Sequence, residues 1–142
     1  MKRARKTRRP SEPPKLRHAA VVVFVLVCAA YLRSVDFDFT YDDHHHVVRN
    51  ELVRDLGNLR ELLPWRYFER EFPDQGRPLL VLSHFLDHAL GGSAAVAHLQ
   101  STLWHGATAL LVVLVAHALG FGVVPSAVCG LLFGLHPVNV EA

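Results

Sequence analysis

The stretch from His88 to Val140 decides the fold class: HALGGSAAVAHLQSTLWHGATALLVVLVAHALGFGVVPSAVCGLLFGLHPVNV. These 53 residues contain no Asp, Glu, Lys or Arg. A bilayer core of about 30 Å takes about 20 helical residues to cross, so the stretch is long enough for two crossings. A soluble domain would carry charges on the outer faces of its helices. The stretch therefore predicts membrane spans at 94–119 and 121–136, joined by a tight turn at Gly120–Gly122.

The second of these spans is short and contains Pro125. Proline inside a helix removes one backbone hydrogen bond and kinks the helix. We therefore expect the 121–136 span to be tilted or kinked. The residues that follow, 137–142, then begin a further segment on the other side of the membrane.

Residues 1–17 form a basic tail, with eight of the fifteen Lys and Arg residues of the chain. The tail is rich in proline and poor in large apolar side chains, so we predict that it is disordered. Such a run can bind nucleic acid or anionic lipid. Because an apolar segment follows at once, we interpret it as the cytoplasmic flank of a membrane helix, with no nucleic-acid partner.

The first apolar segment is AAVVVFVLVCAAYL, at 19–32. Fourteen apolar residues match the core of a signal peptide. Leu16 and Ser34 can extend the helix, however, while flanking arginines reach the head groups. We therefore predict an uncleaved span at 18–33. The arginine, alanine and valine bias suggests a GC-rich genome and a bacterial cytoplasmic membrane.

Residues 34–93 then form one extracytoplasmic loop, with eleven acidic residues and six arginines. Apolar residues at three- and four-residue steps predict an amphipathic helix that ends at Pro64: Val48, Leu52, Val53, Leu56, Leu59, Leu62 and Leu63. A second short helix is predicted at 79–90, closed by Gly91 and Gly92. The predicted fold class is an all-α, polytopic membrane protein with three spans and interfacial helices in the loop.

The motif Tyr41-Asp42-Asp43-His44-His45-His46 follows the first span. Adjacent carboxylates suit a general base or a cation site, and a solvated acidic turn after the helix is the alternative explanation. In an extended chain His44 and His46 face the same way and could chelate zinc with Asp42. No Cys is near and no further ligand has a definable spacing, so we predict no tight metal site.

Three further sets of polar residues are candidates for function. Arg77, at the start of the 79–90 helix, is placed to bind a phosphate or simply a lipid head group. His98 and His105 lie seven residues apart, and so on one helix face, where they bind a ligand or hydrogen-bond to another helix. The last set, His136, Asn139 and Glu141, lies where the third span leaves the membrane.

In this order, these elements resemble the N-terminal part of the transmembrane-and-tetratricopeptide-repeat proteins. These are GT-C glycosyltransferases related to protein O-mannosyltransferases. The matching segments are the aromatic-x-x-Asp-Asp motif at 39–43, Asn50, Arg77-Pro78-Leu79 with Leu82-Ser83, His98-Leu99 with His105, and Leu132-Phe133 with His136-Pro137-Val138 and Val140-Glu141-Ala142. Gly76, Ser101 and Asn139 replace a Tyr, an Asn and a His of the pattern.

The resemblance implies a GT-C-like fold and transfer of a sugar, plausibly mannose, from a polyprenyl-phosphate donor to a protein hydroxyl outside the cytoplasm. Asp42 would act as base, with Asp43 tuning it or holding the acceptor. Arg77 and His136 would stabilise the donor phosphate. No absolute metal requirement is implied, although some GT-C relatives use a divalent cation at the equivalent loop.

Two other classes of function remain open. The chain could be a small membrane-anchored metal-binding protein that uses Asp42, His44 and His46. It could also be a non-catalytic scaffold whose spans only assemble with partners. We expect 142 residues to be the first part of a longer protein, and inactive alone, because they do not close a GT-C active site.

Overall fold

The computed structural model describes residues 14–40, 43–62 and 77–139, and within these ranges it contains helices and no strand. The predicted all-α class is therefore confirmed. The chain divides into two compact units, Tyr31–Trp104 and a second formed by Met1–Ala30 with His105–Ala142. The long helix α4 (Ala94–Ala118) contributes residues to both.

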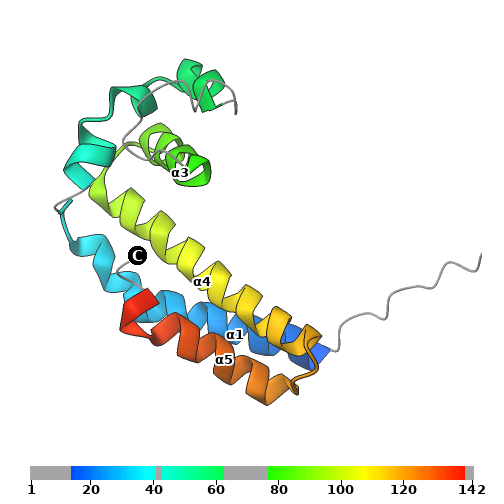
Figure 1. The fold of residues 1–142 in the computed structure, drawn as a ribbon. Helices are drawn as coiled ribbons and strands as arrows, with labels where there is room; N and C mark the ends of the chain where they lie inside the picture. Colours follow the sequence, from blue (N-terminus) through cyan, green and yellow to red (C-terminus); the bar gives the residue numbers. More distant parts are fainter. Residues whose placement is uncertain (1–13, 41–42, 63–76, 140–142) are drawn as a thin grey trace, which may run out of the picture. The chain divides into compact units, whose positions relative to one another are not determined.

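The unit that contains the chain termini is a group of three apolar helices (Figure 1). They are α1 (Pro14–Tyr31), the second half of α4, and α5 (Val123–Leu135), which the short helix η5 (Pro137–Asn139) follows. Leu16, Ala20, Val23 and Val27 recur at three- and four-residue steps along α1 and are buried. This single face packs against neighbouring helices, and most of the remaining α1 surface is apolar and exposed.

Small residues on α5 allow the three helices to approach closely. Ser126, Gly130 and Gly134 recur every four residues and are all buried. A Cβ at Gly130 would collide with Val113 of α4, and one at Gly134 would collide with Val27 of α1. Close approach over small residues is how helices associate in membranes, where apolar burial supplies no driving force between them.

Two of the three predicted spans are long enough to cross a bilayer. The apolar helical stretches Lys15–Asp36 and Ala94–Ala118 have 22 and 25 residues. The third, α5, has 13 residues, about 20 Å at 1.5 Å per residue, which is short of a bilayer core. Pro125 lies in the first turn of α5, where a backbone N–H has no partner within the helix, so the kink expected there is not required.

The turn between α4 and α5 is built on Gly120, whose φ is 98°. The N–H of Gly120 donates to the His117 carbonyl, and that of Phe121 donates to the Ala116 carbonyl. This paired pattern ends a helix with a residue in the left-handed region, which glycine adopts without strain. The His117 ring also bonds the Phe121 carbonyl oxygen at 2.9 Å, as expected of a residue at the end of the helix.

The other unit, Tyr31–Trp104, contains short helices and α3 (Pro78–Ala89) beside the first turns of α4. The short helices are η1 (Leu32–Asp36), η2 (His44–Val48), η3 (Glu51–Arg54) and η4 (Leu56–Leu62). Its small core is made of Val53, Val81 and Phe85, with Leu52 packed against them. α3 therefore packs on η3. It corresponds to the predicted interfacial helix at 79–90, shifted by one residue toward the N-terminus.

The amphipathic α-helix predicted up to Pro64 is not formed as one element. The structure breaks it into the 3₁₀ helices η3 and η4, with Asp55 extended between them. The Asp55 carboxylate accepts the Gly57 N–H at 2.7 Å, and the Asn58 side chain donates to the Leu52 carbonyl at 3.0 Å. Side chains that bond the local backbone compete with the α-helix. Leu63 and Pro64 lie outside the described residues.

Candidate functional site

Thr40 and Asp43 are joined by two hydrogen bonds at the start of the acidic motif, and we call this pair the acidic turn. The Thr40 N–H donates to Asp43 Oδ2 at 3.1 Å, and the Asp43 N–H donates to the Thr40 carbonyl at 2.9 Å. A carboxylate that reaches back to a backbone N–H three residues earlier fixes the start of a helix. Asp43 therefore holds this turn. Tyr41 and Asp42, the predicted base, lie outside the described residues.

The histidine run does not have the extended conformation on which the zinc hypothesis rested. His44–Val48 is a single π-helical turn, closed by the Arg49 N–H on the His44 carbonyl at 3.0 Å. In a helical turn, residues two apart point in different directions, unlike alternate residues of a strand. The backbone at His44–Val48 is therefore helical, whereas the chelate hypothesis assumed an extended chain. The side chains of His45 and His46 lie outside the described residues.

Two contacts attach the segment before the acidic motif to α4. Ser34 Oγ and Thr102 Oγ1 lie 3.4 Å apart, and the Phe39 and His98 rings lie 6.4 Å apart at a tilt of 45°. His98 Nε2 is buried and makes no hydrogen bond within the described residues. Phe39 is the aromatic residue of the Asp-Asp motif, so the structure brings this motif next to the predicted site residue His98.

Asn50 has a structural role that its sequence position did not reveal. Its side chain is the N-cap of η3 and accepts the Leu52 N–H at 3.1 Å. Only 8% of Asn50 is exposed. η3 places Leu52 and Val53 in the core that packs against α3. The Asn50 cap therefore fixes the start of η3, the helix that follows the acidic motif.

Arg77 lies where the sequence predicts it, at the start of α3. It is the N-cap residue of the helix, Pro78 follows at the first helical position, and the Arg77 carbonyl accepts the Val81 N–H at 3.1 Å. The side chain is exposed. α3 ends at Ala89, just before Gly91 and Gly92, which adopt φ of 119° and 65°, so the predicted stop is confirmed.

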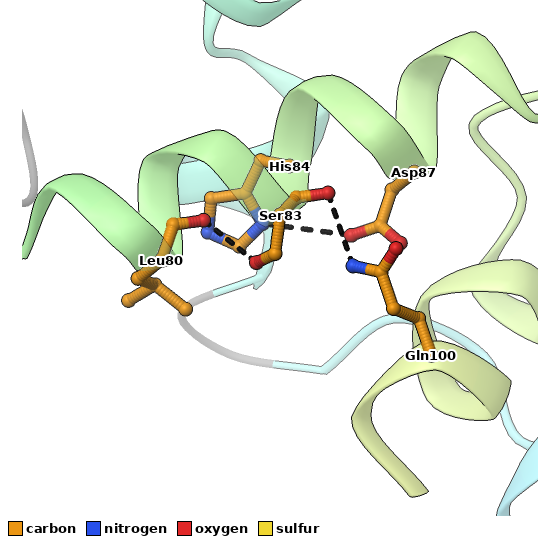
Figure 2. Close-up of polar contacts among 5 residues, drawn as sticks. All are labelled: Leu80, Ser83, His84, Asp87 and Gln100. Atoms are coloured by element: carbon orange, nitrogen blue, oxygen red, sulfur yellow. Dashed lines mark hydrogen bonds and ion pairs between the residues drawn. The ribbon is translucent and has the colours of Figure 1, made fainter. Parts of the chain in front are cut away.

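Polar side chains join α3 to the first turns of α4 (Figure 2). Gln100 Nε2 donates to the Ser83 carbonyl at 3.0 Å, and Ser83 Oγ donates to the Leu80 carbonyl at 2.7 Å. His84 Nδ1 lies 3.7 Å from Asp87 Oδ2. No motif or spacing in the sequence marks His84, Asp87 or Gln100 as part of a site. The only available signal was one acidic residue in an otherwise uncharged helix.

His105 and Asn139 bind the last carbonyl groups of α5. His105 Nε2 lies 2.9 Å from the Gly134 carbonyl oxygen, so this nitrogen carries the proton, and the ring stacks on Phe133. Asn139 Nδ2 donates to the Phe133 carbonyl at 2.9 Å. The last carbonyls of a helix have no partner within it. Both residues therefore act as caps, which agrees with the structural alternative for His105.

His136 follows α5 and is exposed. The Val138 N–H donates to its Nδ1 at 3.3 Å, which places the ring proton of the neutral imidazole on Nε2. A neutral His136 therefore presents an N–H donor away from the helix end. Glu141 lies outside the described residues.

The predicted site residues are divided between the two units. Asp43, Asn50, Arg77 and His98 belong to the unit Tyr31–Trp104, whereas His105 and His136 belong to the other. Within Tyr31–Trp104, the segment that leads into the acidic turn contacts α4 between His98 and Thr102, and α3 is attached to the same stretch through Gln100. This short stretch of α4 is therefore the base on which the candidate site is built.

Comparisons with known proteins found relatives of one kind. Protein O-mannosyl-transferase Tmtc1 of Drosophila melanogaster is 32% identical and covers 96% of the chain, and Tmtc2 of the same organism is 33% identical and covers 82%. Human TMTC2 is 32% identical over 87% of the chain. No family model and no solved structure matches.

The chain spans only 13% to 17% of the length of these relatives. The similarity nevertheless extends over most of the 142 residues, including the elements that carry the acidic motif, Arg77 and the histidines. The chain belongs to the Tmtc family of protein O-mannosyl-transferases, the family that its motifs predict.

Proposed function

We propose that the chain is part of a membrane glycosyltransferase that transfers mannose from a polyprenyl-phosphate donor to a protein hydroxyl. The observation that carries this proposal is the similarity to protein O-mannosyl-transferases over up to 96% of the chain. The arrangement within Tyr31–Trp104 agrees with it, since the acidic turn and the Arg77 helix share one support on α4.

The proposed reaction needs a base for the acceptor and a cation for the leaving group. Asp42 takes the proton of the acceptor hydroxyl as its oxygen bonds to the sugar C1, while the bond from C1 to the phosphate oxygen breaks. Asp43 keeps the turn in place, because its Oδ2 already accepts the Thr40 N–H. Arg77 stabilises the charge that develops on the phosphate.

The proposal places the 34–93 loop outside the cytoplasm, together with the acceptor protein. The phosphate of a lipid-linked donor lies at head-group depth, where an arginine at the start of an interfacial helix can reach it. The basic tail at 1–17 then stays in the cytoplasm.

The test is transfer of labelled mannose from a polyprenyl-phosphate donor to an acceptor peptide, with the complete protein in detergent. Removal of a positioned general base costs roughly 10²–10⁴-fold in rate, so Asp42→Asn should lower transfer by about this factor. Asp36→Asn is the matched control, because Asp36 is an exposed aspartate in the same segment. It should keep wild-type transfer.

Arg77→Ala should raise the KM for the donor as well as lower the rate, because a phosphate contact made in the ground state affects affinity. Full transfer by Asp42→Asn would remove Asp42 from the mechanism. Absence of transfer by the wild-type protein with any polyprenyl-phosphate sugar would refute the proposed function.

A further inference from the structure

The interface between α3 and α4 contains a set of buried polar atoms that the proposed reaction does not use. The Ser83 carbonyl accepts a hydrogen bond from Gln100 Nε2. Asp87 lies one turn further along α3, on the same face as Ser83. Figure 2 shows the hydrogen bond from the Gln100 amide to the Ser83 carbonyl on this face, which also carries Asp87.

Two of these atoms are acceptors that receive no hydrogen bond from the described part of the chain. Asp87 is 3% exposed, and neither its Oδ1 nor Gln100 Oε1 accepts a hydrogen bond within the described residues. The nitrogen and oxygen of the Gln100 amide cannot be exchanged, because only the NH₂ group can donate to the Ser83 carbonyl. The two oxygens cannot satisfy each other. Buried polar groups of this kind need a partner.

The number and type of these acceptor atoms indicate which molecule binds them. Two acceptor oxygens require two donors, and a water molecule carries two O–H groups. Buried waters make about three hydrogen bonds to polar groups, and Asp87 Oδ1 and Gln100 Oε1 supply two of them. A metal ion fits less well, since the described residues contain no group of three His, Cys, Asp or Glu side chains that could hold one.

We propose that Asp87 and Gln100 bind an enclosed water molecule, which donates to Asp87 Oδ1 and Gln100 Oε1 and joins α3 to α4. Together with the Gln100–Ser83 hydrogen bond, this water fixes α3 on the first turns of α4. Arg77 is the residue directly before α3. Gln100 is therefore a positioning residue for Arg77, a role that rests on the proposed function, whereas the water site does not.

The first test is an experimental map of the complete protein that resolves ordered water. A density peak should lie about 2.6–3.2 Å from both Asp87 Oδ1 and Gln100 Oε1. Side chains that point apart, with no peak between them, would overturn the proposal.

Thermal unfolding of the same protein gives an independent test. Gln100→Leu removes the Ser83 hydrogen bond and the water, and should lower the unfolding temperature by about 2 °C. Asp87→Asn keeps the shape and supplies an N–H donor to Gln100 Oε1, so it should not lower the unfolding temperature. Ser83→Ala is the control, because its hydroxyl bonds only within α3 while its carbonyl remains.

A fall of the same size in Asp87→Asn would mean that the charge itself is required. If a chelator lowers the unfolding temperature of the wild type, a metal ion rather than a water molecule occupies the site. Either result overturns the proposal.

The positioning role is tested by the donor KM. Gln100→Leu should lower kcat/KM for the donor by about tenfold, mainly through KM, while Ser83→Ala leaves it unchanged. A wild-type KM in Gln100→Leu would refute the positioning role. If the wild-type protein transfers no sugar, the proposed function fails, and the map and the unfolding temperatures still decide the water site.

Discussion

Asn50 is a nearly buried amide whose oxygen accepts the Leu52 N–H at the start of η3. Loss of such a cap costs about 0.5–2 kcal/mol. We therefore expect Asn50→Ala to lower the unfolding temperature, whereas Asn50→Ser, which keeps an acceptor oxygen, should lower it less. The measurement is thermal unfolding in detergent. Equal stability of Asn50→Ala and the wild type would show that the cap is not needed and favour a ligand contact.

Asn139 replaces a histidine of the family pattern, and its amide donates to the Phe133 carbonyl at the end of α5. A hydrogen bond of this kind contributes about 0.5–1.5 kcal/mol. Asn139→Ala should therefore lower the free energy of unfolding by about this amount. Asn139→His should recover most of it, because an imidazole N–H can reach the same carbonyl. If Asn139→His destabilises as much as Asn139→Ala, the two residues are not equivalent caps.

At the scale of elements, the approach of α5 to its neighbours depends on glycine. A Cβ at Gly130 would collide with Val113 and lie 2.9 Å from the Ala109 carbonyl oxygen. Insertion of atoms into packed interfaces costs about 1–3 kcal/mol. We expect Gly130→Ala to lower the free energy of unfolding by this amount.

Gly122→Ala is the matched control for Gly130→Ala. Gly122 precedes α5 at φ of −65°, and a Cβ there would meet only Pro125, at 3.6 Å. The control should be destabilised less than Gly130→Ala, because alanine is only a poorer N-cap residue than glycine and meets no clash there. Equal effects of the two substitutions would mean that α5 does not pack through Gly130.

At the scale of the whole molecule, the sidedness of the chain remains a prediction. A cysteine at Glu51, which is exposed in the 34–93 loop, should react with an impermeant maleimide on intact cells. A cysteine at Arg8 in the basic tail should react only after the membrane is opened. Cys28 and Cys129 are first replaced by alanine. The reverse labelling pattern, or a mature chain that lacks the first apolar segment, would contradict the orientation.

The sequence by itself determined which segments are apolar helices and where most of them end. The expected ranges 79–90 and 94–119 appear as Pro78–Ala89 and Ala94–Ala118. Helix formation by uncharged, apolar residues and termination at glycine depend on near neighbours only. The relationship to O-mannosyl-transferases was readable for a similar reason, because its motifs are short and local.

Only the tertiary structure decided which polar residues contact one another. Ser34 meets Thr102, and Ser83 meets Gln100, across long separations in sequence. Nothing in local spacing indicates that Asp87 is buried, that Asn50 and Asn139 cap helices, or that the stretch after Val48 becomes two 3₁₀ helices. These outcomes depend on which donor reaches which acceptor after the helices pack, because a buried polar group must find its partner within the folded chain.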